Sequence, residues 1–447
     1  MIIGISAHEL LELKKAGIEK KPLGHDFVYR YPPSDKMPFM DLKRFIGDLD
    51  GADLANEEIA FYLHLPFCTK ICSYCHYSKQ LAGSREIELY TKAAKKEISA
   101  YRELIKGETK LNSIFFGGGT PTLLKAVQLQ DLLDFLSTEF GLDLSGKEVS
   151  IESSPETLQE EKLFALREAG FNRLSIGVQD FNDAVLKQCN RNHRGTQAVQ
   201  AFDSARSAGF DNINIDLLYG LPGQAIESWE QTMRQISELK PESVTASDLR
   251  ILPGAKFYNA EKSVFPSVEQ MLSMYKLFVE QMLSMNYLQQ FPYQFVKKGK
   301  EMAFLEQQWS NGSFLGIGQS SCSFIAKWDY NNAFPLKKYC EAVAGNKISA
   351  AMGKKLSQKE NMIRFAALGL KKSGVNREQG GINKKLFKEK FGLEIEEAFK
   401  WETQKLLALE LIEEKGNFLR LSEKGLFFHD EIGKLFFETG MISQPIG

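Results

Sequence analysis

Cysteine and long apolar runs are both scarce in this sequence of 447 residues. Six cysteines are too few for a disulfide framework in a chain of this length. No uninterrupted apolar run approaches the roughly 20 residues that a membrane-spanning helix needs. The first residues, MIIGISAHELLELKKAG, include acidic residues where a signal peptide has an apolar core. We therefore expect a cytoplasmic protein without a membrane partner.

An excess of charge of one sign is also missing. The 56 Lys and Arg residues nearly balance the 57 Asp and Glu residues, which leaves a formal net charge of -1. A surface that binds nucleic acid or anionic lipid normally carries an excess of positive charge. The balance predicts no nucleic-acid partner, and we expect the chain to be a monomer.

Short β-rich runs alternate with helical stretches from about residue 60 onward. This alternation predicts an α/β fold with a parallel sheet of βα units. About six units in some 200 residues fit a partial (β/α)6 TIM-like barrel better than a complete one. The six predicted strands are AFYLHLP, NSIFFGGG, EVSIESSP, RLSIGVQD, NINIDLLYGLPG and SVTASDLRILP.

Two other segments flank the predicted barrel. We expect an N-terminal extension over residues 1–58, the barrel over 59–335 and a mostly helical C-terminal domain over 336–447. The paired prolines of FVYRYPPSDKM favour an extended strap in the first segment. In the last segment, LIEEKGNFLRLSEKGLFFHDEI predicts a helix, a β-hairpin and a second helix, which is typical of a winged-helix domain.

Three cysteines lie together in HLPFCTKICSYCHYSKQ, directly after the first predicted strand. Three residues separate Cys68 from Cys72, and two separate Cys72 from Cys75. Structural zinc usually takes four protein ligands, and the chain offers no second C-x2-C pair. The spacing instead suits a 4Fe-4S cluster, which ordinarily takes four cysteines, so one iron would stay open to a ligand. Cys189, Cys322 and Cys340 are scattered and are expected to be inert.

Glycines and polar side chains follow the other predicted strands at their C-terminal ends, where a barrel of this type carries its chemistry. The glycines of FFGGGTP allow close approach of a ligand and leave N–H groups free to bind it. Together these residues predict a polar pocket for ribose hydroxyls and an amino-acid moiety. They are Gly117, Gly118, Gly119, Thr120, Glu152, Gln179, Arg191 and Asp216.

Several of these residues also have a structural interpretation. Glu152 could cap a helix that begins near Pro155, and Arg191 could pair with a surface acid. His76 could be a metal ligand, an exposed loop residue or a substrate contact. His64 could make a structural hydrogen bond or act near the site. FLGIGQSS, which contains Ile317 and Gln319, predicts by itself only a loop.

The segments CTKICSYC, GGGTP, GVQDFND and DLLYGLPGQ, in this order, resemble the radical SAM superfamily and, within it, the oxygen-independent coproporphyrinogen III oxidase family. The resemblance covers about residues 60–325. It implies that Cys68, Cys72 and Cys75 hold a 4Fe-4S cluster whose open iron binds S-adenosylmethionine. Reductive cleavage would then give a 5′-deoxyadenosyl radical. It further implies an electron donor such as flavodoxin or ferredoxin, and a small unsaturated or aromatic acceptor such as a tetrapyrrole.

The same resemblance implies roles for single residues. Tyr62 would lie beside the cluster, and with Glu152 and His76 it is assigned to catalysis. Gly117, Ile317 and Gln319 fall near positions that could line a site for a second S-adenosylmethionine. The first S-adenosylmethionine would be bound by Gly118, Gly119, Thr120, Glu152, Gln179, Arg191 and Asp216.

Members of this family differ in the reaction, and the sequence favours one class. About sixty residues before the cysteines count against a haem chaperone, and Tyr77 stands where the oxidases carry a further cysteine. CSYCHY and YPP look more like class C radical SAM methyltransferases and cyclopropanases. We therefore predict that a second S-adenosylmethionine supplies one carbon to an sp2 carbon. The alternatives are a coproporphyrinogen III dehydrogenase, a haem-degrading tetrapyrrole methyltransferase and a haem-binding chaperone.

Overall fold

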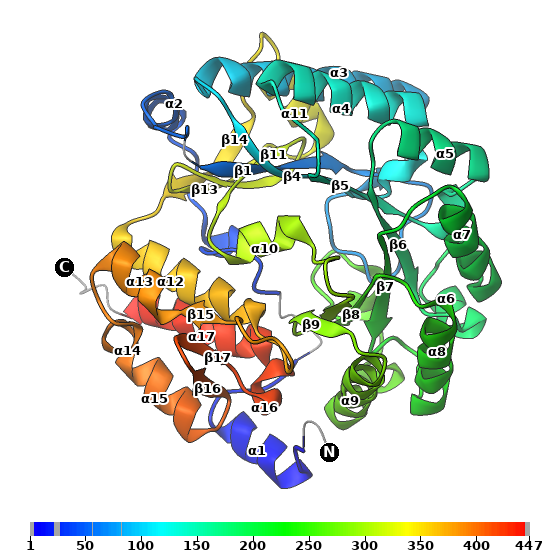
Figure 1. Ribbon diagram of the computed structural model, residues 1–447, viewed down its shortest axis with the longest axis vertical. Helices are drawn as coiled ribbons and strands as arrows, with labels where there is room; N and C mark the ends of the chain where they lie inside the picture. Colours follow the sequence, from blue (N-terminus) through cyan, green and yellow to red (C-terminus); the bar gives the residue numbers. More distant parts are fainter. Residues whose placement is uncertain (1–3, 22–26, 56, 82, 443–447) are drawn as a thin grey trace.

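The computed structural model describes residues 4–21, 27–55, 57–81 and 83–442. A curved, largely parallel sheet forms its centre, and helices cover the outer face of that sheet (Figure 1). The six predicted βα strands are confirmed, and helices α3 (Ser84–Leu104), α4 (Ala126–Phe140), α5 (Glu160–Glu168), α7 (Gly195–Ser207) and α8 (Ile226–Leu239) connect them. These strands are β1 (Glu58–Leu65), β4 (Lys110–Gly118), β5 (Glu148–Ser153), β6 (Arg173–Gln179), β7 (Ile213–Tyr219) and β8 (Ser243–Asp248).

The sheet extends beyond these six strands at both edges. Over the described ranges it contains 12 strands in the order β14-β13-β12-β11-β1-β4-β5-β6-β7-β8-β10-β9, and these do not close into a barrel. β11 (Ser313–Ile317) lies parallel to β1, whereas the outer strands pair in antiparallel fashion. The fold is thus the predicted partial barrel with antiparallel edges. The outer strands are β9 (Leu288–Phe291), β10 (Gln294–Val296), β12 (Cys322–Ile325), β13 (Trp328–Asn332) and β14 (Ala350–Lys355).

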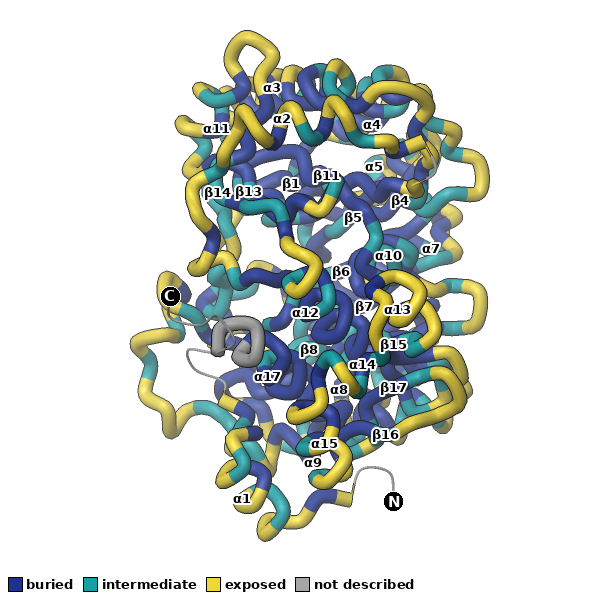
Figure 2. The backbone as a smooth tube through the Cα atoms, turned by 90° about the vertical axis from the view of Figure 1, so that its left-hand side faces the viewer, coloured by how far each residue is buried: buried dark blue, intermediate teal, exposed yellow. Residues whose placement is uncertain are grey.

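The sequence forms this sheet because its strands are apolar on both faces. In β1, Ile59 and Phe61 on one face and Ala60 on the other are all 0% exposed, and helix α4 contributes Leu132 and Leu133 to the core on the first face. Strands buried on both faces are typical of parallel sheets. Figure 2 shows buried backbone along the strands and exposed backbone in the connecting loops.

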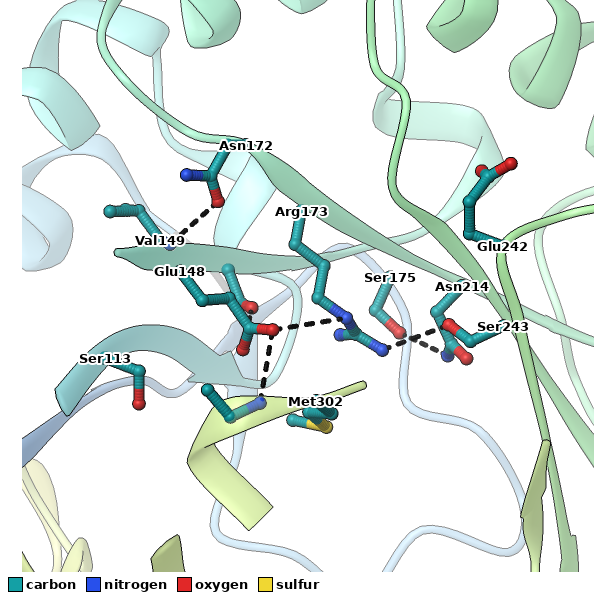
Figure 3. A network of polar contacts seen from close by, with 12 residues as sticks. Ser113, Glu148, Val149, Asn172, Arg173, Ser175, Asn214, Glu242, Ser243 and Met302 are labelled. Carbon is teal, nitrogen blue, oxygen red and sulfur yellow. Dashed lines mark hydrogen bonds and ion pairs between the residues drawn. The ribbon is translucent and has the colours of Figure 1, made fainter. Parts of the chain in front are cut away.

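The interior of the barrel contains a buried charged layer. Arg173 on β6 is 1% exposed, its Nε lies 3.9 Å from Glu148 Oε2, and its Nη2 donates to Ser243 Oγ at 3.2 Å (Figure 3). The backbone N–H of Ala303, the first residue of α10 (Ala303–Trp309), donates to the same Glu148 oxygen at 3.3 Å. This layer attaches α10 to the inside of the barrel, and Glu148 balances the charge of Arg173.

The C-terminal segment is mostly helical and contains a small sheet in the order β15-β17-β16. The hairpin of β16 (Ile412–Lys415) and β17 (Phe418–Leu421) stands between helices, as the winged-helix prediction requires. The domain boundaries at 58 and 335 stay predictions, and β14, which follows residue 335, still pairs with β13. The other elements here are α12 (Gln358–Gly369), β15 (Ile382–Asn383), α13 (Lys384–Phe391), α14 (Ile395–Ala398), α15 (Lys400–Ala408), α16 (Glu423–Leu426) and α17 (His429–Ile442).

Buried ion pairs connect the N-terminal extension, the barrel and the C-terminal segment. Lys20 Nζ, between α1 (Ala7–Lys15) and α2 (Leu42–Asp50), lies 3.1 Å from Asp248 Oδ2 at the end of β8. Arg250 Nη1 donates to Glu431 of α17 at 2.8 Å. Because both pairs are buried, loss of one partner would leave an uncompensated charge, so the three parts hold one another in place. No helix among the described residues is long and apolar enough to cross a bilayer.

Candidate functional site

The three clustered cysteines lie on the loop that follows β1. Cys68 ends β2 (Phe67–Cys68), and β3 (Gln80–Leu81) pairs with β2 in parallel, so these short strands close the base of the loop. The Ser73 N–H donates to the Cys189 carbonyl at 2.9 Å and anchors its tip. The thiols of Cys68, Cys72 and Cys75 are free, half-buried and line one cavity of about 420 Å³. The fold therefore presents all three sulfurs to a common space.

The spread of these sulfurs fits a cluster better than a single zinc ion. Three sulfurs on one zinc, each about 2.3 Å from it, fall within roughly 4.6 Å of one another. Among the described residues, the only such group within 4.8 Å is Asp248, His429 and Asp430, so the cysteine sulfurs lie further apart. A 4Fe-4S cluster needs this wider spacing because each thiolate binds a different iron.

The group of Asp248, His429 and Asp430 is itself better explained by ion pairs than by a metal. Arg250 Nε lies 2.6 Å from Asp248 Oδ2, and Lys371 Nζ lies 2.6 Å from Asp430 Oδ1. These cations already neutralise the carboxylates, so a metal ion would have to displace them.

The glycines after β4 form a cradle beside the cysteine loop. A Cβ atom on Gly119 would lie 2.8 Å from Cys68 Sγ and 2.5 Å from the Phe67 carbonyl oxygen. Gly118 has φ of 122°, and its N–H donates to Glu152 Oε2 at 2.8 Å. Thr120 follows, and its N–H donates to the Phe67 carbonyl at 2.8 Å. Only glycine fits this close approach. The N–H groups of Gly118, Gly119 and Thr120 all donate within the protein, so the prediction that these groups are free to bind a ligand is wrong.

The predicted polar residues converge on the cavity of the three cysteines. Glu152, Gln179 and Asp216 stand on neighbouring strands, while Arg191 follows the short helix α6 (Asp183–Gln188). Gln179 has φ of 70°, in the left-handed region, at an irregularity between β6 and β7. A non-glycine residue in that region is found mostly where function or packing requires it. Glu152 does not cap the following turn but accepts from Gly118.

Burial weakens the acids of this cavity. It raises the pKa of Glu152 to about 8, with a smaller contribution from nearby Asp216, while the Gly118 N–H opposes the shift. Burial also raises the pKa of Asp216, although Ser175 donates to its carboxylate at 2.6 Å. The Cys68 thiol has a pKa of about 11, because of burial and then the neighbouring Cys75 and Cys72. A bound cation would reverse this effect and favour the thiolate.

Arg191 connects the cysteine loop to the strand ends. Its Nη1 lies 3.4 Å from Cys72 Sγ, and its Nη2 donates to Ser154 Oγ at 2.8 Å and to the Gly177 carbonyl. Its Nε is buried and has no hydrogen-bond partner. An unpaired buried donor of this kind is costly unless a ligand accepts from it. The donor set therefore fits a cluster on the cysteines with an anionic ligand group beside it.

A second cavity of about 580 Å³ adjoins the first, and we call it the aromatic cavity. The two share His76, Tyr77, Gly118 and Glu152 in their walls. Most of this lining was not predicted, because its residues carry no sequence motif. It includes Tyr29, Tyr62, His64, Tyr293, Phe304, Trp309, Phe314, Cys322, Asn331, Lys371 and His429.

Tyr62 and His64 form a fixed pair at the end of β1. His64 Nε2 lies 3.2 Å from the Ser78 carbonyl, which can only accept, so Nε2 carries the proton. His64 Nδ1 then accepts from the Tyr62 hydroxyl at 3.0 Å. Burial lowers the pKa of His64 to about 4, which keeps the ring neutral. His64 thus makes structural hydrogen bonds and lines the aromatic cavity as well. His76, whose ring is tilted by 34° against that of Tyr77 with centroids 4.4 Å apart, lines both cavities.

The three residues expected at a second S-adenosylmethionine line neither cavity. A Cβ atom on Gly117 would meet Tyr62 and Glu152, and Ile317 is buried in β11 beside β1. Gln319 is also buried, and its Nε2 donates to Ser78 Oγ at 3.2 Å while its Oε1 has no partner. Their assignment stays a prediction.

A buried carboxylate that the sequence did not indicate holds the loop of Gln319. Glu97 on α3 accepts from the Gly318 N–H at 2.8 Å, the Tyr339 hydroxyl at 2.9 Å and the Asn332 amide at 2.9 Å. Burial raises its pKa to about 7. Its contacts span strands far apart in sequence, so no local pattern could have revealed it.

Comparisons with known proteins agree with this geometry. The radical SAM superfamily matches residues 62–236, and the HemN C-terminal domain matches residues 356–428. The heme chaperone HemW of Bacillus subtilis is 31% identical over 83% of this chain and 97% of its own. An oxygen-independent coproporphyrinogen III oxidase of Synechocystis is 27% identical over 75% of each chain.

A solved structure is similar over nearly the whole length. The radical SAM enzyme coproporphyrinogen III oxidase (HemN) of Escherichia coli superposes with a TM-score of 0.79 at 25% identity, over 93% of this chain and 99% of that one. The predicted superfamily and fold class are thereby confirmed.

Proposed function

The chain belongs to the HemN and HemW family of the radical SAM superfamily, whose cofactors are a 4Fe-4S cluster and S-adenosylmethionine, and from this premise we propose its reaction. In our proposal Cys68, Cys72 and Cys75 hold the cluster, and the radical made there removes a hydrogen atom from a tetrapyrrole in the aromatic cavity. One-carbon transfer, which the sequence favoured, finds no support among the named relatives, whereas the oxidases and haem chaperones support a tetrapyrrole.

The observation that carries this proposal is the junction of two unlike cavities. The cavity lined by the three cysteines, which we call the polar cavity, also contains the residues able to bind an amino acid and a ribose. The aromatic cavity is lined mainly by apolar and ring side chains, which suits a flat apolar macrocycle. His76, Gly118 and Glu152 stand in both walls, so a cofactor in one cavity would meet a substrate in the other.

When bound, the cluster would supply the electron that cleaves S-adenosylmethionine to methionine and a 5′-deoxyadenosyl radical. The protein's residues would bind and orient. Gly118 and Gly119 admit the ligand close to the cysteines, and Arg191 Nε can donate to its carboxylate. Glu152, whose pKa is about 8, can hold a proton at neutral pH and donate it to a ribose oxygen. The rings of Phe304 and Phe115 are stacked with their centroids 5.3 Å apart, and in our proposal they exclude water from the aromatic cavity.

Haem binding without turnover is a second candidate. The similarity to the Bacillus subtilis heme chaperone HemW covers 97% of that protein. In addition, Lys371 is the only Lys or Arg that the described part of the chain contributes to the aromatic lining, and it is already paired with Asp430. Four substrate carboxylates, as in coproporphyrinogen III, would find few cations there.

An anaerobic assay tests the proposal. Reconstituted protein, dithionite and methyl-labelled S-adenosylmethionine are incubated with haem or coproporphyrinogen III, and the products are analysed by mass spectrometry. We expect 5′-deoxyadenosine to form together with a tetrapyrrole that has lost hydrogen. Labelled carbon on the tetrapyrrole would instead establish one-carbon transfer and a second S-adenosylmethionine. Haem bound and released to an apoprotein, with no 5′-deoxyadenosine, would establish the chaperone. Replacing dithionite by flavodoxin or ferredoxin tests the proposed electron donors.

A further inference from the structure

Behind one wall of the aromatic cavity, two buried arginines share a single carboxylate. Arg30 comes from the N-terminal strap and Arg364 from α12, and they are 3% and 0% exposed. Both contact Asp329 of β13, Arg30 by a hydrogen bond to Oδ1 and Arg364 through Nε at 3.3 Å from Oδ2. No other carboxylate of the described residues pairs with either arginine. Counting the described residues, this buried group therefore keeps one positive charge that no acid compensates.

The other group that Arg30 contacts is Cys322 of β12. Arg30 Nη1 donates to Cys322 Sγ at 3.4 Å. A neighbouring guanidinium favours the thiolate form of a cysteine. Cys322 is half-buried and lines the aromatic cavity, opposite Asn331 in the β12–β13 pairing. The sulfur can thus supply the missing negative charge at the face where the tetrapyrrole would lie.

Two donors in this group still lack partners. Arg30 Nε and Arg364 Nη2 are buried and form no hydrogen bond. Burying an unpaired donor is unfavourable, and a native structure usually keeps one only for a reason. Arg364 also lies over the ring of Phe324, with its guanidinium carbon 3.7 Å from the ring centroid. The arrangement therefore concentrates positive charge behind Cys322.

The histidines of the same cavity are less suited to bind a metal. His64 uses both ring nitrogens, toward Tyr62 and Ser78. His429 is buried, with Nδ1 3.0 Å from the Leu426 carbonyl and Nε2 3.4 Å from Asp430. His76 remains as a competing nitrogen ligand, on the cysteine loop.

We propose that Cys322, held by Arg30, is the protein ligand to the iron of a haem bound in the aromatic cavity. This inference rests on the proposed function and narrows its substrate to a tetrapyrrole that already carries its metal. Thiolates are established axial ligands of haem iron. Binding forms one S–Fe bond, breaks the S–H bond of any thiol present and releases that proton to solvent. No electron is transferred in this step.

Ferric haem titrated into the oxidised, cluster-loaded protein tests the proposal by electron paramagnetic resonance and absorption. We expect the signature of thiolate ligation in the wild type. Cys322→Ser should abolish it and weaken haem binding about tenfold. The matched control is Cys340→Ser on α11 (Leu336–Ala342), since Cys340 is also half-buried but lines neither cavity, and it should change nothing.

A second measurement does not depend on folding of the variant. In the wild-type protein, alkylation of Cys322 mapped by mass spectrometry should slow about tenfold on addition of haem, while alkylation of Cys340 stays unchanged. A nitrogen-ligand signature that survives Cys322→Ser would overturn the inference and point to His76. Absence of haem binding, with 5′-deoxyadenosine still formed from coproporphyrinogen III, would also overturn it and leave the proposed function standing. Absence of both would refute the proposed function itself.

Discussion

The polar cavity and the aromatic cavity of this protein are assembled in different ways. The polar cavity takes its residues from the ends of successive βα strands, where Glu152, Gln179 and Asp216 follow one another along the chain. The aromatic cavity takes Tyr29 from the N-terminal strap and His429 from the C-terminal helix, hundreds of residues apart. The first cavity therefore carries readable motifs, and the second does not. Short motifs thus indicate the residues of the polar cavity, whereas the residues of the aromatic cavity come together only where distant segments pack.

This contrast predicts which variants affect which step. Changes in the polar cavity should stop cleavage of S-adenosylmethionine whether or not a tetrapyrrole is present. Changes in the aromatic cavity should alter tetrapyrrole binding alone. A variant in one cavity that alters both cleavage of S-adenosylmethionine and tetrapyrrole binding would show that the two cavities work as one site.

The largest effect is expected for Cys72→Ala. Loss of one of three cluster ligands should abolish both cluster incorporation and formation of 5′-deoxyadenosine. Iron content and product analysis by mass spectrometry measure the two effects. Cys189→Ala is the control, because Cys189 lines neither cavity and its hydrogen bond to the cysteine loop uses its backbone carbonyl, which alanine keeps, so the iron content should stay unchanged. A fully loaded cluster in the Cys72 variant would refute the ligand assignment.

Gly119→Ala should reduce cluster incorporation by about tenfold or more. The added Cβ would lie 2.8 Å from Cys68 Sγ and 2.5 Å from a backbone oxygen, so the cysteine loop must shift. Gly47→Ala on α2 is the matched control, since a Cβ there meets nothing within 4 Å. Equal iron content in both variants would mean that the loop tolerates the shift.

Glu97→Gln should change the pH dependence of stability, because the wild-type carboxyl has a pKa of about 7 when folded and about 4.5 when unfolded. The folded state favours the protonated form of Glu97. The contribution of this carboxyl to the free energy of unfolding is therefore complete below about pH 4.5 and is lost as the pH rises through 7. The loss can reach about 3 kcal/mol.

Urea unfolding at pH 5 and at pH 8 gives the difference in the free energy of unfolding between the two pH values. This difference should be smaller in Glu97→Gln than in the wild type. Glu103→Gln, at an exposed position of the same helix, serves as control and should keep the wild-type difference. An unchanged difference in Glu97→Gln would show that the carboxyl stays ionised in its buried network.

Phe304→Leu should give the smallest effect and the most specific one. The ring of Phe304 lies 5.3 Å from Phe115 and 5.8 Å from Tyr62 in the aromatic cavity. Its loss should weaken tetrapyrrole binding about tenfold while cleavage of S-adenosylmethionine without substrate stays unchanged. Fluorescence quenching and 5′-deoxyadenosine analysis measure these effects. Phe164→Leu on α5, exposed and remote from both cavities, should match the wild type. If Phe304→Leu also lowered the cleavage of S-adenosylmethionine without substrate, the two cavities would not have separate roles.

Several expectations from sequence had different outcomes. The radical SAM family, the partial barrel and the helical C-terminal segment are confirmed. One-carbon transfer is not supported by the relatives, which are named as oxidases and haem chaperones. Cys322 was expected to be inert, yet it lines the aromatic cavity beside Arg30. Isolated cysteines carry no spacing signal, so only the fold could reveal this position.

The sequence by itself determined the six parallel strands, the cysteine loop and the ring of polar residues around it. These features depend on periodicity and on spacing within single βα units, which local sequence records. The tertiary structure alone decided the antiparallel edges of the sheet, the proton position on His64, the burial of Glu97 and the lining of the aromatic cavity. Each of these arises where segments distant in the chain pack together, and a pairing of that kind leaves no pattern in either segment alone.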